Sequence, residues 1–89
     1  MAAELSRPES TSGDPNATEM IRIWLAHNSL QITVRLGMWS EGGQDEREAW
    51  GYLLADVIRN ISQGLAVRCN WETNETMRCI LDSLSRHTQ

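Results

Sequence analysis

The sequence has no lysine and no phenylalanine, and it holds only two cysteines and two histidines. Without lysine it has neither Schiff-base chemistry nor the phosphate-binding lysine of a P-loop. A four-ligand zinc site would need Cys69, Cys79, His27 and His87 to converge, and the spacing of the cysteines is not that of a metal site. Neither histidine has a reason to lie near a cysteine and act as its base. We therefore expect two reduced thiols, no metal, no cofactor and no enzymatic activity.

A surplus of positive charge is also missing. All eight basic residues are arginine, and they are scattered among twelve acidic residues, which leaves a formal net charge of -4. A domain that binds duplex nucleic acid needs a basic face to displace counterions from phosphate. No apolar run approaches the roughly 18 residues of a membrane span, and the first residues lack the pattern of a secretory signal. These features predict a cytoplasmic chain that binds neither nucleic acid nor membrane.

The composition divides the chain into a tail and a folded part. Residues 1–17 combine proline, glycine, serine, threonine and asparagine without periodicity, which predicts a disordered N-terminal tail. The remainder carries most of the 40% hydrophobic content and all four tryptophans. We expect one α+β domain over residues 18–87.

Two segments between Thr18 and Leu36 alternate apolar and polar residues with the period of a β-strand. A tight turn centred on His27 and Asn28 would pair apolar residues on one face of a hairpin, namely Leu25 with Leu30, Ile23 with Ile32 and Ile21 with Val34. Because His-Asn is a weaker turn signal than Asn-Gly, a four-residue loop from Ala26 to Ser29 remains an alternative.

The longest pattern has the period of a helix and runs over residues 45–67. Its apolar stripe consists of Trp50, Leu53, Leu54, Val57, Ile58, Ile61 and Leu65. Gly64 could cap this helix, but Leu65 still fits the stripe, so we favour continuation to about Arg68. A second helix, capped by Asn70 or Thr73, is expected to run to about Arg86. The predicted fold is thus an antiparallel β-hairpin followed by two α-helices (ββαα), with a sheet that dimerisation could extend.

Three short motifs resemble those of a known family. They are Arg22-x-Trp24, Arg35-x-Gly37-x-Trp39 and Trp50-Gly51-x-Leu53-Leu54-x-Asp56-x-x-Arg59. The pattern is similar to that of a small bacterial family, known mainly from proteobacteria, which is catalogued as a domain of unknown function. The resemblance covers residues 18–86 and implies a compact α+β fold. It implies no activity, cofactor or catalytic residue.

The outer face of the hairpin is the first candidate surface. It carries Met20, Arg22, Trp24, Gln31, Thr33 and Arg35, and Trp39 would join it if the strand continues past Gly37. An isolated hairpin is marginal in water, and this one has apolar groups on both faces. Its cover could come from its own helices or from a second copy, through edge pairing into a four-stranded sheet or through packing of the Trp24 face. We favour the second copy and expect a homodimer.

A second candidate interface lies on the first helix, where Tyr52, Asp56 and Arg59 project away from the apolar stripe. These residues either form a solvated face with an ion pair or contact a partner. Trp50 and Trp71 are expected in the core. The sequence therefore predicts a non-enzymatic, self-associating interaction or regulatory module. The alternative is a small-ligand-binding domain that uses the face formed by Arg22, Trp24 and Arg35.

Overall fold

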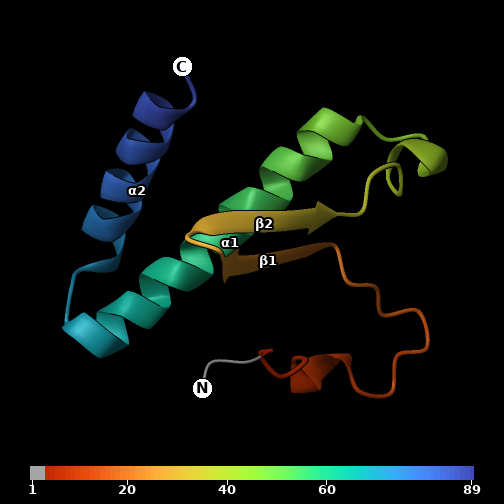
Figure 1. Ribbon diagram of the computed structural model, residues 1–89, viewed down its shortest axis with the longest axis horizontal. Helices are drawn as coiled ribbons and strands as arrows, with labels where there is room; N and C mark the ends of the chain where they lie inside the picture. Colours follow the sequence, from red (N-terminus) through yellow and green to blue (C-terminus); the bar gives the residue numbers. More distant parts are fainter. Residues whose placement is uncertain (1–3) are drawn as a thin grey trace. The chain divides into compact units, whose positions relative to one another are not determined.

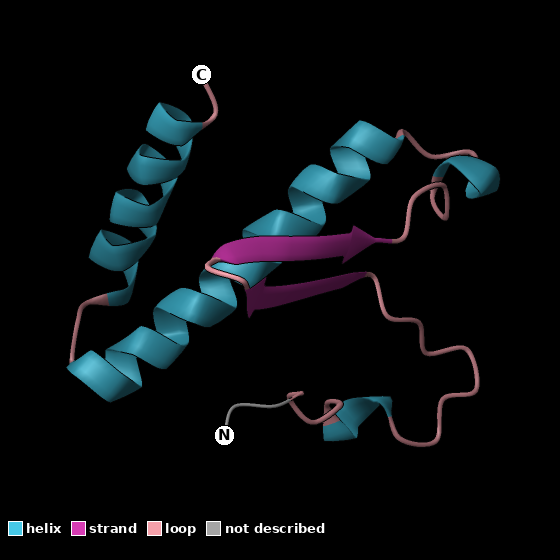
Figure 2. Cartoon of the chain, viewed as in Figure 1, coloured by secondary structure: helices cyan, strands magenta, loops and turns pink. Residues whose placement is uncertain are grey.

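The computed structural model describes residues 4–89 and confirms the ββαα order (Figures 1 and 2). Its elements are the short 3-10 turn η1 (Glu9–Thr11), strands β1 (Ile21–Ala26) and β2 (Ser29–Val34), the 3-10 turn η2 (Ser40–Gly42), and helices α1 (Glu46–Cys69) and α2 (Thr73–His87). The chain divides into two compact units, with the boundary between Leu36 and Gly37. The expected disorder of residues 1–17 and the single domain over residues 18–87 stay predictions.

The hairpin has the predicted register. Ile21 pairs with Val34, Ile23 with Ile32 and Leu25 with Leu30, so the apolar residues share one face. His27 and Asn28 both have positive φ, 53° and 61°, as a two-residue type I′ turn requires. The tight turn is therefore correct, and the strands extend to Ala26 and Ser29 on either side of it.

The connection from the hairpin to α1 folds onto the start of the helix. The Glu46 carboxylate accepts hydrogen bonds from the backbone N–H of Gly37 at 2.9 Å, from the N–H of Ser40 at 3.0 Å, and from Trp50 Nε1 at 2.9 Å. Trp39 packs edge to face against Trp50, with 5.4 Å between ring centroids and an interplanar angle of 89°. Glu46 and Trp50 thus hold the connection in place.

Helix α1 runs over 24 residues although it contains two glycines, Gly51 and Gly64, which weaken a helix interior. The Asp45 side chain caps it by accepting from the Arg47 N–H at 3.0 Å. The helix passes through Gly64, as predicted, and ends at Cys69 because Asn70 adopts a left-handed conformation with φ 59°.

The predicted cap of the second helix is wrong. Helix α2 is capped by Glu72, whose carboxylate accepts from the N–H groups of Asn74 at 2.8 Å and Glu75 at 2.9 Å. Asn70 is already used to end α1, and Thr73 is the first helical residue. The longer glutamate side chain reaches back to the orphan N–H groups of the first turn.

In the unit Gly37–Gln89, which contains both helices, the buried residues are two small polar ones. Ser62 of α1 donates to the Ile58 carbonyl at 2.9 Å, and Thr76 of α2 donates to the Glu72 carbonyl at 3.0 Å. Each hydroxyl is thus satisfied within its own helix. Among residues 4–89, no hydrophobic side chain is buried. Trp50 is only half-buried, and the prediction that Trp71 lies in the core is wrong, since it is 56% exposed in the link between the helices.

Candidate functional site

The apolar face of the hairpin is largely exposed. We call it the apolar hairpin face; it consists of Ile21, Ile23, Leu25, Leu30, Ile32 and Val34. Leu25 is 79% exposed, and all six residues of β2 are exposed. A contiguous apolar surface of this kind is typical of an interaction site in a folded protein.

The outer hairpin face brings together six of the seven residues proposed for it, all but Trp39. Arg22 lies opposite Thr33, Trp24 lies opposite Gln31, and the Met20 carbonyl accepts from the Arg35 N–H at 2.9 Å. Trp39 does not join them, because β2 ends at Val34 and Trp39 packs on Trp50 instead. The condition set by the sequence, a strand that continues past Gly37, is therefore not met.

Arg22 on the outer face is already paired with acidic residues. The Arg22 guanidinium contacts Glu4 at 2.7 Å and Glu19 at 2.9 Å. Its hydrogen bond to Glu19, with the charges of Glu19 and Glu4, raises the pKa of Arg22 above its ordinary value. A cavity of about 720 Å³, lined by Trp24, Arg22 and residues such as Leu5, lies between β1 and the N-terminal segment.

On α1 the second proposed interface is solvated. Arg59 forms an ion pair with Asp56, and the Asp56 carbonyl also accepts from the Asn60 side chain at 2.9 Å. Tyr52 is 77% exposed. The neighbouring apolar stripe is itself incompletely covered, since Leu54, Val57 and Ile61 are all exposed.

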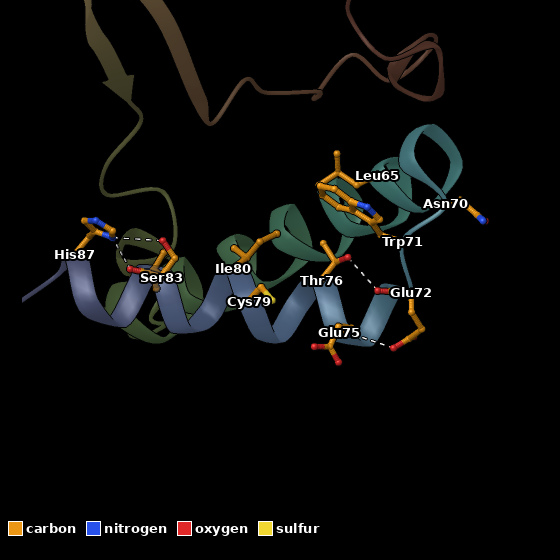
Figure 3. Close-up of a pocket in the computed structure, with 11 residues that line it drawn as sticks. Leu65, Asn70, Trp71, Glu72, Glu75, Thr76, Cys79, Ile80, Ser83 and His87 are labelled. Carbon is orange, nitrogen blue, oxygen red and sulfur yellow. Dashed lines mark hydrogen bonds between the residues drawn. The ribbon is translucent and has the colours of Figure 1, made fainter.

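A groove between the end of α1 and α2 was missed from the sequence (Figure 3). Its volume is about 810 Å³, and its apolar lining includes Leu65, Trp71, Ile80 and Leu84. The free thiol of Cys79 also lines it. One signal in the sequence could have indicated it. In the second helix, apolar residues recur with a spacing of three and four positions, and Trp71 lies just before that helix, so the apolar surface extends beyond the helix itself.

Glu46, which lies outside these surfaces, has a structural role. The hydrogen bond from the Gly37 N–H, followed by those from Ser40 and Trp50, holds the pKa of Glu46 below its ordinary value.

Among residues 4–89, no three side chains of histidine, cysteine, aspartate or glutamate gather as a metal site requires. In the same range, no helix combines the length and apolarity needed to span a membrane.

Comparison with known proteins gives a family and a fold. The family described as "Domain of unknown function (DUF5076)" matches residues 4–89, which includes most of the N-terminal segment as well as the range expected from the motifs. A solved structure described as a "putative pyruvate dehydrogenase" from the photosynthetic bacterium Rhodopseudomonas palustrus CGA009 is 19% identical. It aligns with a TM-score of 0.73 over 100% of this chain and 85% of the other. At this identity the likeness shows the fold alone. No curated protein matches the chain.

Proposed function

The chain belongs to the DUF5076 family of domains of unknown function, and since that description names no activity, we propose its role from its own surface. It is a non-enzymatic, cytoplasmic interaction or regulatory module that works as a homodimer. The observation that carries this proposal is the absence of any buried hydrophobic side chain among residues 4–89.

A chain with this exposure gains little from the hydrophobic effect by itself. Burial of apolar side chains is the main favourable term in folding, and a chain of this size has little stability to spare. The exposed apolar residues gather on faces, five of them on the apolar hairpin face. Faces of this kind favour cover by another molecule over free exposure to water.

The proposed occupant of these faces is a second copy of the chain. A second copy is the partner that is present wherever the chain is made. It also offers the same apolar hairpin face for a symmetric contact.

Light scattering on the purified full chain after size exclusion tests this proposal. The expected mass is twice the chain mass of 10.1 kDa, and the melting temperature should rise with protein concentration, because dissociation accompanies unfolding. Tyr52→Ala is the matched control on α1 and should leave the mass unchanged. A folded monomer at all concentrations would remove the proposal, and dissociation by Tyr52→Ala would move the interface to the second surface.

The alternative is a small-ligand-binding domain that uses the face of Arg22, Trp24 and Arg35. What favours it is the cavity of about 720 Å³ beside β1, in which an aromatic and a guanidinium group line one space. A thermal-shift screen with nucleotides and aromatic metabolites tests it. Stabilisation that Trp24→Ala abolishes would support this face as the site. Stabilisation that survives Trp24→Ala, or none with any compound, would count against it.

A further inference from the structure

We propose that two copies pair through the free edge of β2, which forms a four-stranded antiparallel sheet with Ile32 on the two-fold axis. This inference rests on the proposed self-association and specifies its interface. It follows from the direction of the backbone groups, from the difference between the two hairpin edges and from the register that joins two copies of β2.

The turn fixes which backbone groups of β2 point outward. In a two-residue hairpin the residues that flank the turn, here Ala26 and Ser29, exchange both backbone hydrogen bonds, and the bonded pairs then alternate along the ladder. The bond from the Arg35 N–H to the Met20 carbonyl at 2.9 Å agrees with this alternation. The N–H and C=O groups of Leu30, Ile32 and Val34 therefore point away from β1. Because the sheet of the described residues has two strands, they have no strand partner there.

The two edges of the hairpin differ in how they are protected. Strand β1 carries Arg22, which forms ion pairs with Glu4 and Glu19 of the N-terminal segment. Strand β2 has the sequence SLQITV, with no charge, proline or glycine, and every residue in it is exposed. Charged side chains and neighbouring chain segments are the usual protection of an edge strand. The edge of β2 has no such charge, and its β-branched, uncharged sequence suits strand pairing.

Hydrogen bonding limits the register of two antiparallel copies. An outward-pointing residue must lie opposite an outward-pointing residue of the other copy. With Ile32 on the axis, Ile32 pairs with its own copy and Leu30 pairs with Val34, so all three outward residues of each strand are bonded. Moving the axis to Gln31 pairs Val34 with the turn residue Asn28, and moving it to Thr33 pairs Leu30 with Leu36, beyond the strand. Ile32 on the axis thus uses the most strand residues.

The same register keeps the apolar surface continuous. The outward residues Leu30, Ile32 and Val34 also carry the side chains of the apolar hairpin face, so this face of one copy adjoins that of the other. Gln31 lies opposite Thr33 on the outer side. No like charges meet, because the one charged neighbour, Arg35, lies opposite Ser29.

Disulfide trapping tests the register in a Cys69→Ser, Cys79→Ser background. Position 31 of one copy lies opposite position 33 of the other as a non-hydrogen-bonded pair. Its Cα separation of about 4.5 Å is within the range of a disulfide. Gln31→Cys combined with Thr33→Cys should therefore give a covalent dimer on mild oxidation. Neither single variant should, because like positions are diagonal and about 7–8 Å apart. Cross-linking by Gln31→Cys alone or by Thr33→Cys alone would overturn Ile32 as the axis.

Proline substitution tests the edge without relying on a disulfide. Ile32→Pro and Ile23→Pro each remove one isoleucine of a cross-strand pair, and both N–H groups point away from the hairpin, so its own ladder is retained. Ile32→Pro should weaken the dimer at least about thirtyfold, from two lost backbone bonds at the axis. Ile23→Pro, the matched control, should weaken it much less, as measured by sedimentation velocity.

The outcomes separate this inference from the proposed function. A wild-type dimer that resists the cysteine pair, or one that Ile32→Pro leaves intact, would overturn the β2 edge while self-association stands. A wild-type monomer at all concentrations would remove both.

Discussion

The apolar hairpin face can be weakened without changing the shape of its strands. Ile23→Thr with Ile32→Thr keeps two β-branched residues in a cross-strand pair, so strand preference is retained while apolar surface is lost. The two isoleucines are 54% and 57% exposed. If full burial of isoleucine contributes about 2 kcal/mol, covering the exposed half contributes about 1 kcal/mol for each side chain.

The double variant should therefore dissociate more readily. In the edge-paired dimer Ile32 lies beside its own copy, whereas Ile23 lies on the far strand β1. Two isoleucines per dimer therefore lose cover, so the loss is about 2 kcal/mol of association free energy, or about a thirtyfold increase in Kd. Sedimentation equilibrium across a wide concentration range measures this Kd, and far-ultraviolet circular dichroism reports whether the variant is folded. If dimerisation and folding are inseparable, the variant should sediment as a monomer that has lost its secondary structure.

Val67→Thr is the matched control. It is the same kind of exchange at a residue that is 90% exposed in the last turns of α1. A singly exposed apolar residue is normal at a protein surface, so its Kd should stay within about twofold of wild type. A folded Ile23→Thr, Ile32→Thr variant with wild-type affinity would refute the reasoning, as would an equal effect of Val67→Thr.

Two further predictions concern the connection and α1. Hydrogen bonding lowers the pKa of Glu46 below the ordinary 4.5. The contribution of Glu46 to stability is therefore fully present above pH 4.5 and is lost as the pH falls through the lower folded value. Glu46→Gln should lower the melting temperature at pH 7, and the difference from wild type should shrink in melts below pH 4. An equal difference at pH 3 would contradict this role. Gly37→Ala should lower the free energy of unfolding by about 1–2 kcal/mol, because Gly37 has φ 98° although the added Cβ would meet nothing closer than 3.6 Å. The control is Gly51→Ala in α1, where a Cβ would have open space around it. Gly51→Ala should raise the free energy of unfolding by about 0.5–1 kcal/mol. Urea unfolding measures both variants.

The hairpin was predictable in detail because its signals are local. Apolar and polar residues alternate with the period of a strand, and a shift of one residue would turn every apolar side chain to the other face. Only the pairing of Ile23 with Ile32, and of its neighbours, keeps them together. The extent of α1 through Gly64 was predictable for a similar reason, because Leu65 continues the helical period.

The places where the prediction failed depend on contacts that no single pattern contains. Trp39 leaves the hairpin because Glu46 binds the Gly37 N–H nine residues before it and Trp50 offers an aromatic edge. Glu72 caps α2 because its side chain is long enough to reach Asn74 and Glu75, whereas Asn70 ends α1. Each outcome depends on side-chain contacts that the periodicity of the sequence does not contain.

The sequence by itself determined the elements, their order and the face of each that is apolar, since periodicity within a strand or helix depends only on neighbours along the chain. Only the tertiary structure decided how much of those faces is covered. It left Leu25 and Ile32 exposed, tied Arg22 to the N-terminal segment and left the edge of β2 uncharged. Burial depends on which surfaces meet in space, and periodicity along the chain carries no information about that.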